Sequence, residues 1–237
     1  MPVTLKLATS LDGRIATAAG ESRWITGEAA RRAVHQLRAR HDAVLVGAET
    51  ALADDPELTT RLSVPGLNPV RIVVDSTLRI PVTARVLNAE APTWVLTTAR
   101  ASAERVVLDS RQRLSPSSRL ARTAREIPTY VVAMGEPRPD LVSAGVRVIT
   151  VRPVGEDRPE LKSVLQALEV EGLSRIFVEG GGQVAASFLR CGLVDALEWF
   201  RAPLVIGGEG RPGVGALAVA ALAEAPHFRR IEVSVVG

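Results

Sequence analysis

The sequence predicts an α/β protein, a single domain with a largely parallel central sheet flanked by helices. Strand patterns and helix patterns alternate along the chain, as they do in folds built from β-α-β units. Apolar residues of the helical segments recur at i, i+3, i+4 and i+7, and short apolar runs such as DAVLVG have the length of buried strands. The 237 residues are 46% hydrophobic and 23% charged, which suffices for a packed core without disulfides or a structural metal.

The first half of the chain opens with a predicted strand at Val3–Thr9, followed by a turn at Leu11–Gly13. Thr26 is the expected N-cap of a helix, with Glu28 in the first turn, where the helix dipole favours an acidic residue. An apolar stripe makes this helix half-buried: Ala30, Ala33, Val34 and Leu37. Further strands are predicted at Asp42–Gly47, Arg71–Asp75 and Thr93–Thr97.

The second half repeats the alternation. Helical spacing of four apolar residues predicts a helix over Leu161–Glu171: Leu161, Val164, Leu165 and Leu168. This helix leads into a strand at Arg175–Val178, a glycine run, and a helix from about Gln183 to Cys191. The last strands are predicted at Asp195–Arg201 and Leu204–Ile206.

One segment occurs twice in similar form. RIVVDSTLRIPVTARVLNAEAPTWVLTT (Arg71–Thr98) resembles RVVLDSRQRLSPSSRLARTAREIPTYVVAM (Arg105–Met134). Periods of this size can indicate a solenoid, but only two copies exist and nothing that flanks them repeats. We therefore interpret residues 105–134 as a local insertion within one domain that spans residues 1–237.

Composition limits the partners. The net charge is only +3, basic residues are scattered, and aromatics make up 3%, so stacking platforms for nucleic-acid bases are scarce and no nucleic-acid partner is expected. An arginine-rich solvated surface that attracts phosphorylated small molecules is favoured instead. No signal peptide or membrane-spanning run is recognised, so no membrane partner is expected. The single cysteine, Cys191, fits a reducing compartment, and the expected location is the cytoplasm.

The strongest candidate site is VEGGGQVAASFL (Val178–Leu189). A buried strand ends at Glu179, three glycines follow, and a helix begins. Glycines let the backbone approach a ligand closely, and a helix N-terminus offers N–H groups and a positive dipole end to a phosphate. A phosphate or pyrophosphate lying on Gly181–Ser187 is one interpretation, and a tight turn without a ligand is the other.

Two other segments are weaker candidates. Gly208–Gly213 matches G-x-G-x-x-G, but too little chain follows for a dinucleotide unit, and Pro212 removes an N–H donor, so a surface loop is preferred. Asp54 and Asp55 form an acidic pair without a third ligand at suitable spacing, so no metal is expected. His35 and His41, on different faces of the predicted helix, are expected to be surface residues.

Five motifs in a fixed order resemble a known family. They are KLATSLDGRIA (Lys6–Ala16), SRWIT (Ser22–Thr26), DAVLVGAETALADDPELTTR (Asp42–Arg61), PVRIVVDS (Pro69–Ser76) and VEGGG. Together they resemble the pyrimidine reductase of riboflavin biosynthesis, which has a dihydrofolate-reductase-like fold and is often the C-terminal half of a bifunctional deaminase–reductase. The resemblance covers nearly the whole chain. The zinc deaminase motifs H-x-E and P-C-x-x-C do not occur, so only the reductase part is expected.

The resemblance implies a reductase that uses NADPH to convert the ribosyl group of 5-amino-6-(5-phosphoribosylamino)uracil to ribityl, in a homodimer. It implies cofactor contacts from Ala8, Trp24, Thr50, Asp54, Ser76, Gly181, Gly182, Gln183, Val184, Ala185, Ala186 and Ser187. It implies substrate contacts from Ser22, Arg38, Leu58, Arg61 and Glu179. An arginine pair suits the substrate phosphate, because guanidinium forks match phosphate oxygens.

The reaction also needs a proton, and Lys6, Asp54 and Glu179 match positions that the family implicates in proton transfer or substrate polarisation. Both copies of the near-repeat contain Asp-Ser, so Ser76 or Ser110 can be the cofactor contact, with Ser76 preferred. The diaminopyrimidinone precursor remains open as the substrate. A dihydrofolate-type reductase and a non-enzymatic nucleotide-binding module remain alternative functions.

Overall fold

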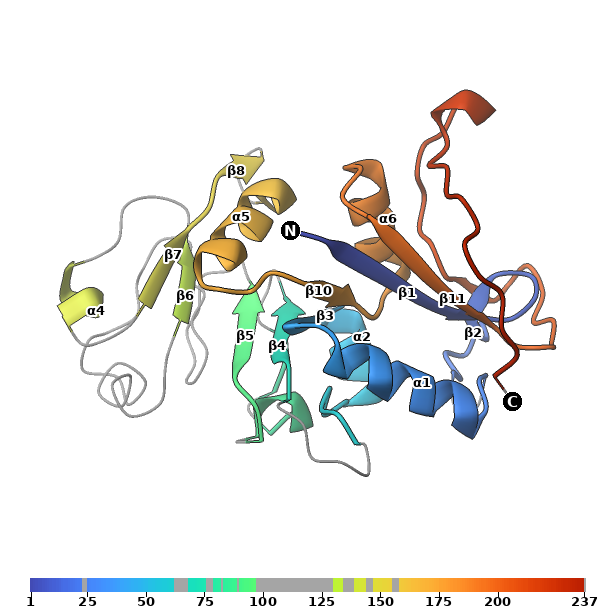
Figure 1. Ribbon diagram of the computed structural model, residues 1–237, viewed down its shortest axis with the longest axis horizontal. Coiled ribbons are helices and arrows are strands. Elements are labelled where there is room, and N and C mark those ends of the chain that lie inside the picture. The colour runs from blue at the N-terminus through green and yellow to red at the C-terminus, as the bar shows by residue number, and fades with distance from the viewer. Residues whose placement is uncertain are drawn as a thin grey trace. The chain divides into compact units, whose positions relative to one another are not determined.

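The computed structural model describes residues 1–22, 25–61, 68–75, 79–81, 83–88, 90–96, 130–133, 139–143, 147–154 and 158–236 (Figure 1). Its strands are β1 (Val3–Thr9), β2 (Arg14–Ala16), β3 (Ala43–Gly47), β4 (Val70–Val74), β5 (Thr93–Leu96), β6 (Tyr130–Ala133), β7 (Arg147–Thr150), β8 (Pro153–Val154), β9 (Arg158–Pro159), β10 (Ile176–Val178), β11 (Ala196–Arg201) and β12 (Arg211–Pro212). Its helices are α1 (Glu28–Ala39), α2 (Ala48–Asp54), α4 (Pro139–Ser143), α5 (Leu161–Val170), α6 (Gly182–Arg190) and the short 3₁₀ turns η1 (Arg85–Leu87) and η2 (Leu222–Glu224).

The main sheet has six strands in the order β11-β1-β10-β3-β4-β5. β1 pairs in parallel with both β10 and β11, β10 pairs in parallel with β3, and β4 with β5. The pairs β11-β1, β1-β10 and β10-β3 join strands that are not consecutive in the chain, so the chain crosses over between them. The predicted α/β architecture with a largely parallel sheet is confirmed.

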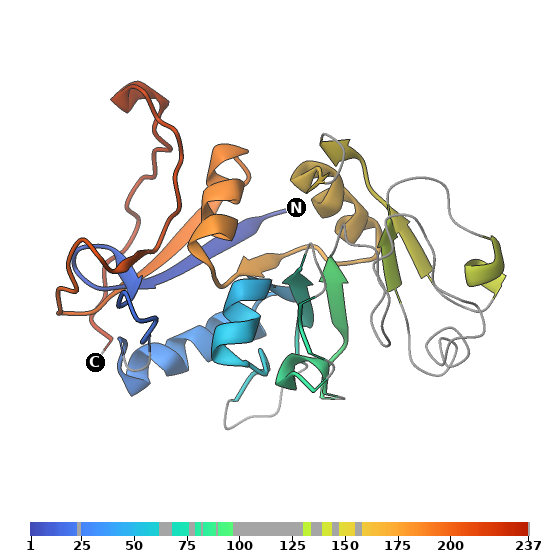
Figure 2. The same cartoon turned by 180° about the vertical axis from the view of Figure 1, so that it is seen from behind.

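The chain forms two compact units. One consists of Pro2–Val46, Thr59–Pro69 and Arg175–Gly237, and contains β1, β10, β3 and β11. Figures 1 and 2 show α1 and α6 on opposite faces of β1 and β10. Side chains of β1 alternate accordingly: Val3, Leu5 and Leu7 are buried, whereas Thr4 and Lys6 on the other face are half-buried.

The other unit consists of Met1, Gly47–Leu58 and Val70–Ser174. Here β4 and β5 pair in register from Arg71 with Thr93 to Val74 with Leu96, and Val164, Leu165 and Leu168 of α5 are buried. The side chain of Arg71 is also buried, and donates to the side chain of Asn88 at 2.7 Å and to its carbonyl at 2.6 Å. These hydrogen bonds compensate the cost of burying a guanidinium.

The near-repeat lies only partly within the described residues. The strand TWVL of the first copy is β5, and the matching YVVA of the second copy is β6, which pairs in parallel with β7. Residues 97–129 and 134 lie outside the described part of the chain. The insertion at residues 105–134 and the extent of the domain therefore stay predictions.

Most predicted elements are found within two residues of the expected bounds, with three corrections. The N-cap of α1 is Gly27 rather than Thr26, because the helix begins one residue later and Gly27 has the extended conformation of a cap. Leu204–Ile206 is not a strand: its backbone bonds to the turn of Leu11 and Asp12, and Val205 is exposed. The helix Ala48–Asp54 was not predicted, and Thr97 of the fifth predicted strand lies outside the described residues.

Candidate active site

An ion pair joins α1 to the residue that follows β10. Glu179 lies directly beyond Val178, and both of its carboxylate oxygens accept hydrogen bonds from Arg38, one from Nε and one from Nη2 at 2.8 Å. The two side chains are only 11% and 6% exposed. Burial lowers the pKa of the Arg38 guanidinium, but the charge of Glu179 and its hydrogen bonds outweigh this and raise that pKa above its ordinary value.

Strand register brings Lys6 to the same level as this pair. Leu5 of β1 is the partner of Val178, so Lys6 is level with Glu179, and on the other side Lys6 is the partner of Glu198 in β11. Residues that are level on parallel neighbouring strands point to the same face. Lys6 therefore stands between two carboxylate residues. It lies on the face of the sheet that α1 covers, because Thr4, on the same face of β1, contacts His41, which follows α1 in the chain.

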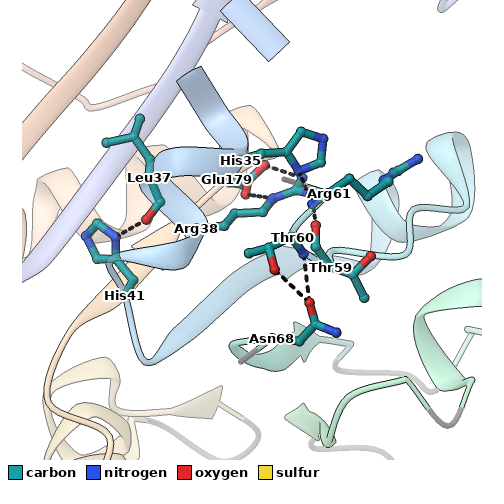
Figure 3. A network of polar contacts seen from close by, with 9 residues as sticks. All are labelled: His35, Leu37, Arg38, His41, Thr59, Thr60, Arg61, Asn68 and Glu179. Atoms are coloured by element: carbon teal, nitrogen blue, oxygen red, sulfur yellow. Dashed lines mark hydrogen bonds and ion pairs between the residues drawn. The ribbon is translucent and has the colours of Figure 1, made fainter. Parts of the chain in front are cut away.

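The segment Thr59–Arg61 is held by side chains from elsewhere in the same unit (Figure 3). The Thr59 carbonyl accepts from Arg38 Nη1 at 3.0 Å, and the backbone N–H of Arg61 donates to Nδ1 of His35 at 3.2 Å. Between them, the N–H and hydroxyl of Thr60 bond to the side-chain oxygen of Asn68, both at 2.9 Å. This segment therefore has one side-chain anchor at each of three successive residues.

The glycine run after Glu179 meets a second glycine segment. Gly181, the N-cap of α6, has φ +82°, a conformation that favours glycine. A Cβ at Gly182 would lie 2.7 Å from the Pro212 carbonyl oxygen, and the N–H of Gly215 donates to the Gly182 carbonyl at 2.8 Å. The absence of a side chain at Gly182 is therefore already required by protein backbone, whether or not a ligand binds.

The expected phosphate contacts fall into two groups, one at the N-terminus of α6 and one further along the helix. Gly181, Gly182, Gln183 and Val184 form the cap and first turn, where N–H groups precede the first helical hydrogen bond, from Ala185 to Gly181. The side chains of Ala185 and Ala186 are buried in the core. The Ser187 hydroxyl donates to the Gln183 carbonyl at 2.9 Å. Only the first four residues therefore offer the helix N-terminus to an anion.

The remaining expected site residues are distributed as follows. Ala8 and Ser22 are half-buried in the unit that contains Glu179. Thr50, Asp54 and Leu58 belong to the other unit: Thr50 is half-buried and Asp54 exposed in α2, while Leu58 is buried with φ +55°. Trp24, Ser76 and Ser110 lie outside the described residues. The contacts of all these residues with cofactor or substrate stay predictions.

Two structural features of this region were not anticipated. His35 and His41 were expected on the surface, but both are half-buried, and His41 stacks on Phe177 with ring centroids 4.9 Å apart. Asp12 accepts hydrogen bonds from Ser10 Oγ at 2.6 Å and from the N–H groups of Ile206 and Gly207 at 3.1 and 2.8 Å. The turn signal at Leu11–Gly13 indicated Asp12, but its distant partners left no signal in the sequence.

Two classes of feature are missing from the described part of the chain. No group of three or more histidine, cysteine, aspartate or glutamate residues is arranged there to hold a metal ion. No helix among the described residues is long and apolar enough to cross a bilayer.

Comparison with known proteins identifies relatives along the whole chain. The RibD C-terminal domain family matches residues 2–106 and 101–237. A riboflavin biosynthesis protein RibD from Bacillus amyloliquefaciens is 34% identical over 237 residues, which cover 99% of this chain and 54% of the relative. A 2,5-diamino-6-ribosylamino-4(3H)-pyrimidinone 5′-phosphate reductase from Methanothermobacter thermautotrophicus is 39% identical over 208 residues, which cover 87% of this chain and 79% of the relative.

Among solved structures, RibD of Acinetobacter baumannii superposes with a TM-score of 0.69 at 29% identity, covering 100% of this chain and 55% of that one. This likeness confirms the predicted dihydrofolate-reductase-like fold. The chain spans about half the length of the RibD proteins that it matches. On the family match, which runs from residue 2 to residue 237, the chain belongs to the RibD C-terminal domain family.

Proposed function

We propose that the chain is a reductase of riboflavin biosynthesis that uses NADPH to convert the ribosyl group of 5-amino-6-(5-phosphoribosylamino)uracil to ribityl. The observation that carries the proposal is the buried Arg38–Glu179 pair, with Lys6 level with Glu179 on the neighbouring strand. Glu179 directly precedes the glycine run at which α6 begins. The Methanothermobacter relative, of which the chain covers 79%, is named a reductase of a closely related phosphate ester.

The first turn of α6 fits a phosphate of the dinucleotide. Gly181, Gly182 and Val184 are half-buried rather than sealed in the core, and their N–H groups stand at the positive end of the helix dipole. Gly181–Val184 would hold this phosphate. Ser76 stays a predicted phosphate contact, and Ala8, Trp24 and Thr50 stay predicted contacts of the nicotinamide and its ribose. When bound, the cofactor supplies the hydride that reduces C1 of the opened ribose.

The chain's own residues supply position and the proton. Both carboxylate oxygens of Glu179 accept from Arg38, which suits Glu179 to orienting and accepting from a substrate hydroxyl rather than donating a proton. Lys6, between Glu179 and Glu198, is the preferred donor of the proton that the reduced sugar takes up. Asp54, exposed at the end of α2, remains a second candidate.

A second substrate is favoured by one observation. The relative at 39% identity is named for the 2,5-diaminopyrimidinone rather than the uracil. Both compounds carry the same ribose phosphate, so Ser22, Arg61 and the Arg38–Glu179 pair would serve either. A dihydrofolate-type activity would not need Arg61, and a non-enzymatic nucleotide-binding module would not need Lys6.

The decisive experiment is oxidation of NADPH, followed at 340 nm, with the phosphoribosylaminouracil, the diaminopyrimidinone and dihydrofolate in parallel. Turnover of a phosphoribosyl compound, lost in Lys6→Met and weakened mainly in KM by Arg61→Met, is expected. Turnover of dihydrofolate alone, or of none of the three, would exclude the proposed function. Stabilisation against heat by NADPH but not by NADH, measured in the same preparation, is the expected cofactor preference.

The proposed protein partner is a second copy of the chain. Near its C-terminus, Ile231, Val233 and Val235 alternate with polar residues and are 87%, 70% and 95% exposed. Such alternation is typical of a strand with one buried face. β11 is an edge strand of the main sheet as described, and its Trp199 is 50% exposed. Association of two copies would cover this apolar surface.

A further inference from the structure

His35 lies one turn before Arg38 on the same face of α1, and both contact the segment Thr59–Arg61. Because the backbone N–H of Arg61 donates to Nδ1 of His35, this nitrogen carries a lone pair and no proton. The neutral ring then has its proton on Nε2. A doubly protonated ring has no acceptor left for Arg61.

The charges around the ring favour the neutral form. Burial, followed by the positive charges of Arg38 and Arg61, lowers the pKa of His35, while the Thr59 carbonyl and Glu179 act in the opposite direction. These are the groups that face the ring from its own helix, from the segment Thr59–Arg61 and from the end of β10. The contact between His35 and Arg61 is accordingly present at neutral pH.

The guanidinium of Arg38 is already engaged within the protein. Arg38 already gives Nε and one Nη2 hydrogen to Glu179, and Nη1 to the Thr59 carbonyl. Its guanidinium is therefore committed to holding the carboxylate and the backbone. The side chain of Arg61 extends away from the Arg38–Glu179 pair, as Figure 3 shows.

We propose that His35 is a positioning residue for substrate binding: its neutral imidazole holds the backbone of Arg61, so that the Arg61 guanidinium is set to receive the substrate phosphate. This inference rests on the proposed reductase function. Arg38 serves the same end by fixing Thr59 two residues earlier. The proposal makes phosphate binding depend on the protonation state of His35.

The test compares His35→Ala, His35→Asn and His35→Gln with the wild-type protein in NADPH oxidation with the phosphoribosylaminopyrimidine substrates from pH 5.5 to 8. Asparagine places its carbonyl oxygen where Nδ1 stood, whereas glutamine places it where Nε2 stood. His35→Ala and His35→Gln are expected to raise KM about 10-fold, the loss of one well-placed hydrogen bond, with kcat changed less than about 3-fold. His35→Asn is expected to stay within about 3-fold of the wild-type KM.

The pH profile separates positioning from a general loss of structure. The substrate phosphate titrates equally in all variants, so the ratio of wild-type KM to the KM of His35→Asn isolates the histidine. This ratio is expected to rise as the pH falls, because protonation of Nδ1 removes the acceptor of the Arg61 N–H in the wild-type protein, whereas the asparagine carbonyl stays an acceptor. Gln36→Ala, an exposed change on the same helix, is the matched control and should leave KM unchanged.

Equal KM values for the Asn and Gln variants, a loss confined to kcat, or a flat KM ratio would overturn the proposal. A second measurement is independent of turnover: exchange of the Arg61 amide hydrogen should accelerate in His35→Ala but not in His35→Asn. If the wild-type protein reduces no substrate, the reductase function fails, whereas the amide measurement still decides whether His35 holds Arg61.

Discussion

At the scale of single residues, the sequence indicated where charged residues lie but not which residues they pair with. The sequence placed Glu179 at the end of a buried strand before a glycine run, and its role as a site residue was implied by the family resemblance. Its pairing with Arg38 joins residues 141 positions apart, and no local pattern reports such a contact. The family resemblance implied a substrate contact for Arg38, which stays a prediction; in the structure three of its donors bond to Glu179 and Thr59.

Neutralising Glu179 is expected to destabilise the protein. Glu179→Gln leaves the buried guanidinium of Arg38 without a counter-charge, and the free energy of unfolding in urea should fall by about 3 kcal/mol. The control is Glu28→Gln, because Glu28 and Arg32 form a pair that is 78% and 67% exposed, worth about 0.5 kcal/mol. Replacing both buried partners, in Arg38→Met with Glu179→Leu, should cost less than Glu179→Gln alone. Equal losses in the two glutamine variants would show that the buried pair contributes no more than the exposed one.

Asp12 should hold the Ile206–Gly207 backbone down to strongly acid pH. The hydrogen bond from Ser10, followed by that from the Gly207 N–H, lowers the pKa of Asp12 from 3.8 to about 2. A carboxyl whose folded pKa is lowered contributes stability above its unfolded pKa, and this contribution is lost as the pH falls through the folded value. Protection of the Gly207 amide against hydrogen exchange should therefore be constant from neutral pH to pH 3.8 and fall toward pH 2. Asp12→Ala should lack this protection throughout, and an unchanged amide in that variant would contradict the assignment.

At the scale of elements, helices and strands with strong apolar periodicity were predictable. β1 and α5 follow such patterns, and their bounds agree with prediction to within one residue. The strand predicted at Leu204–Ile206 was wrong, because three apolar residues can also lie in a loop, here one that is hydrogen-bonded to the turn at Asp12. The close approach of Pro212 to Gly182 could not be read from either glycine run, because it depends on tertiary packing.

A methyl group at Gly182 is expected to separate the two glycine segments. Gly182→Ala would bring Cβ to 2.7 Å from the Pro212 carbonyl oxygen, a contact that the backbone can relieve only by moving. The expected loss is about 2 kcal/mol in the free energy of unfolding, as in other overpacked sites. NADPH should also stabilise the variant less against heat. Gly208→Ala, with nothing within 4 Å of the added Cβ, is the matched control and should change stability by less than about 1 kcal/mol. Identical behaviour of the two alanine variants would contradict the packing argument.

At the scale of the whole molecule, alternation of strand and helix patterns was enough to predict the class of fold. The strand order β11-β1-β10-β3-β4-β5 was not predictable, because it depends on which strands, distant in the sequence, pair with one another in the folded chain. The alternating residues of Ile231–Val235 have the period of a strand, yet the structure assigns them to none of its sheets. Within the described part of the chain these apolar side chains are exposed, and the proposed association with a second copy would bury them.

Association through this segment should be sensitive to charge on one face only. Val233→Asp introduces a carboxylate among the exposed apolar side chains, 70% exposed at this position, and burying it between two copies would be costly. Light scattering after size exclusion should give a dimer for the wild-type protein and a monomer for Val233→Asp. Ser234→Asp adds the same charge one residue later, on the opposite face of an extended strand, and should remain dimeric. A wild-type monomer at all concentrations, or equal effects of the two aspartates, would exclude the segment as the interface. Because neither change touches the Arg38–Glu179 pair, NADPH turnover measured on the same samples will report whether the single copy is sufficient for activity.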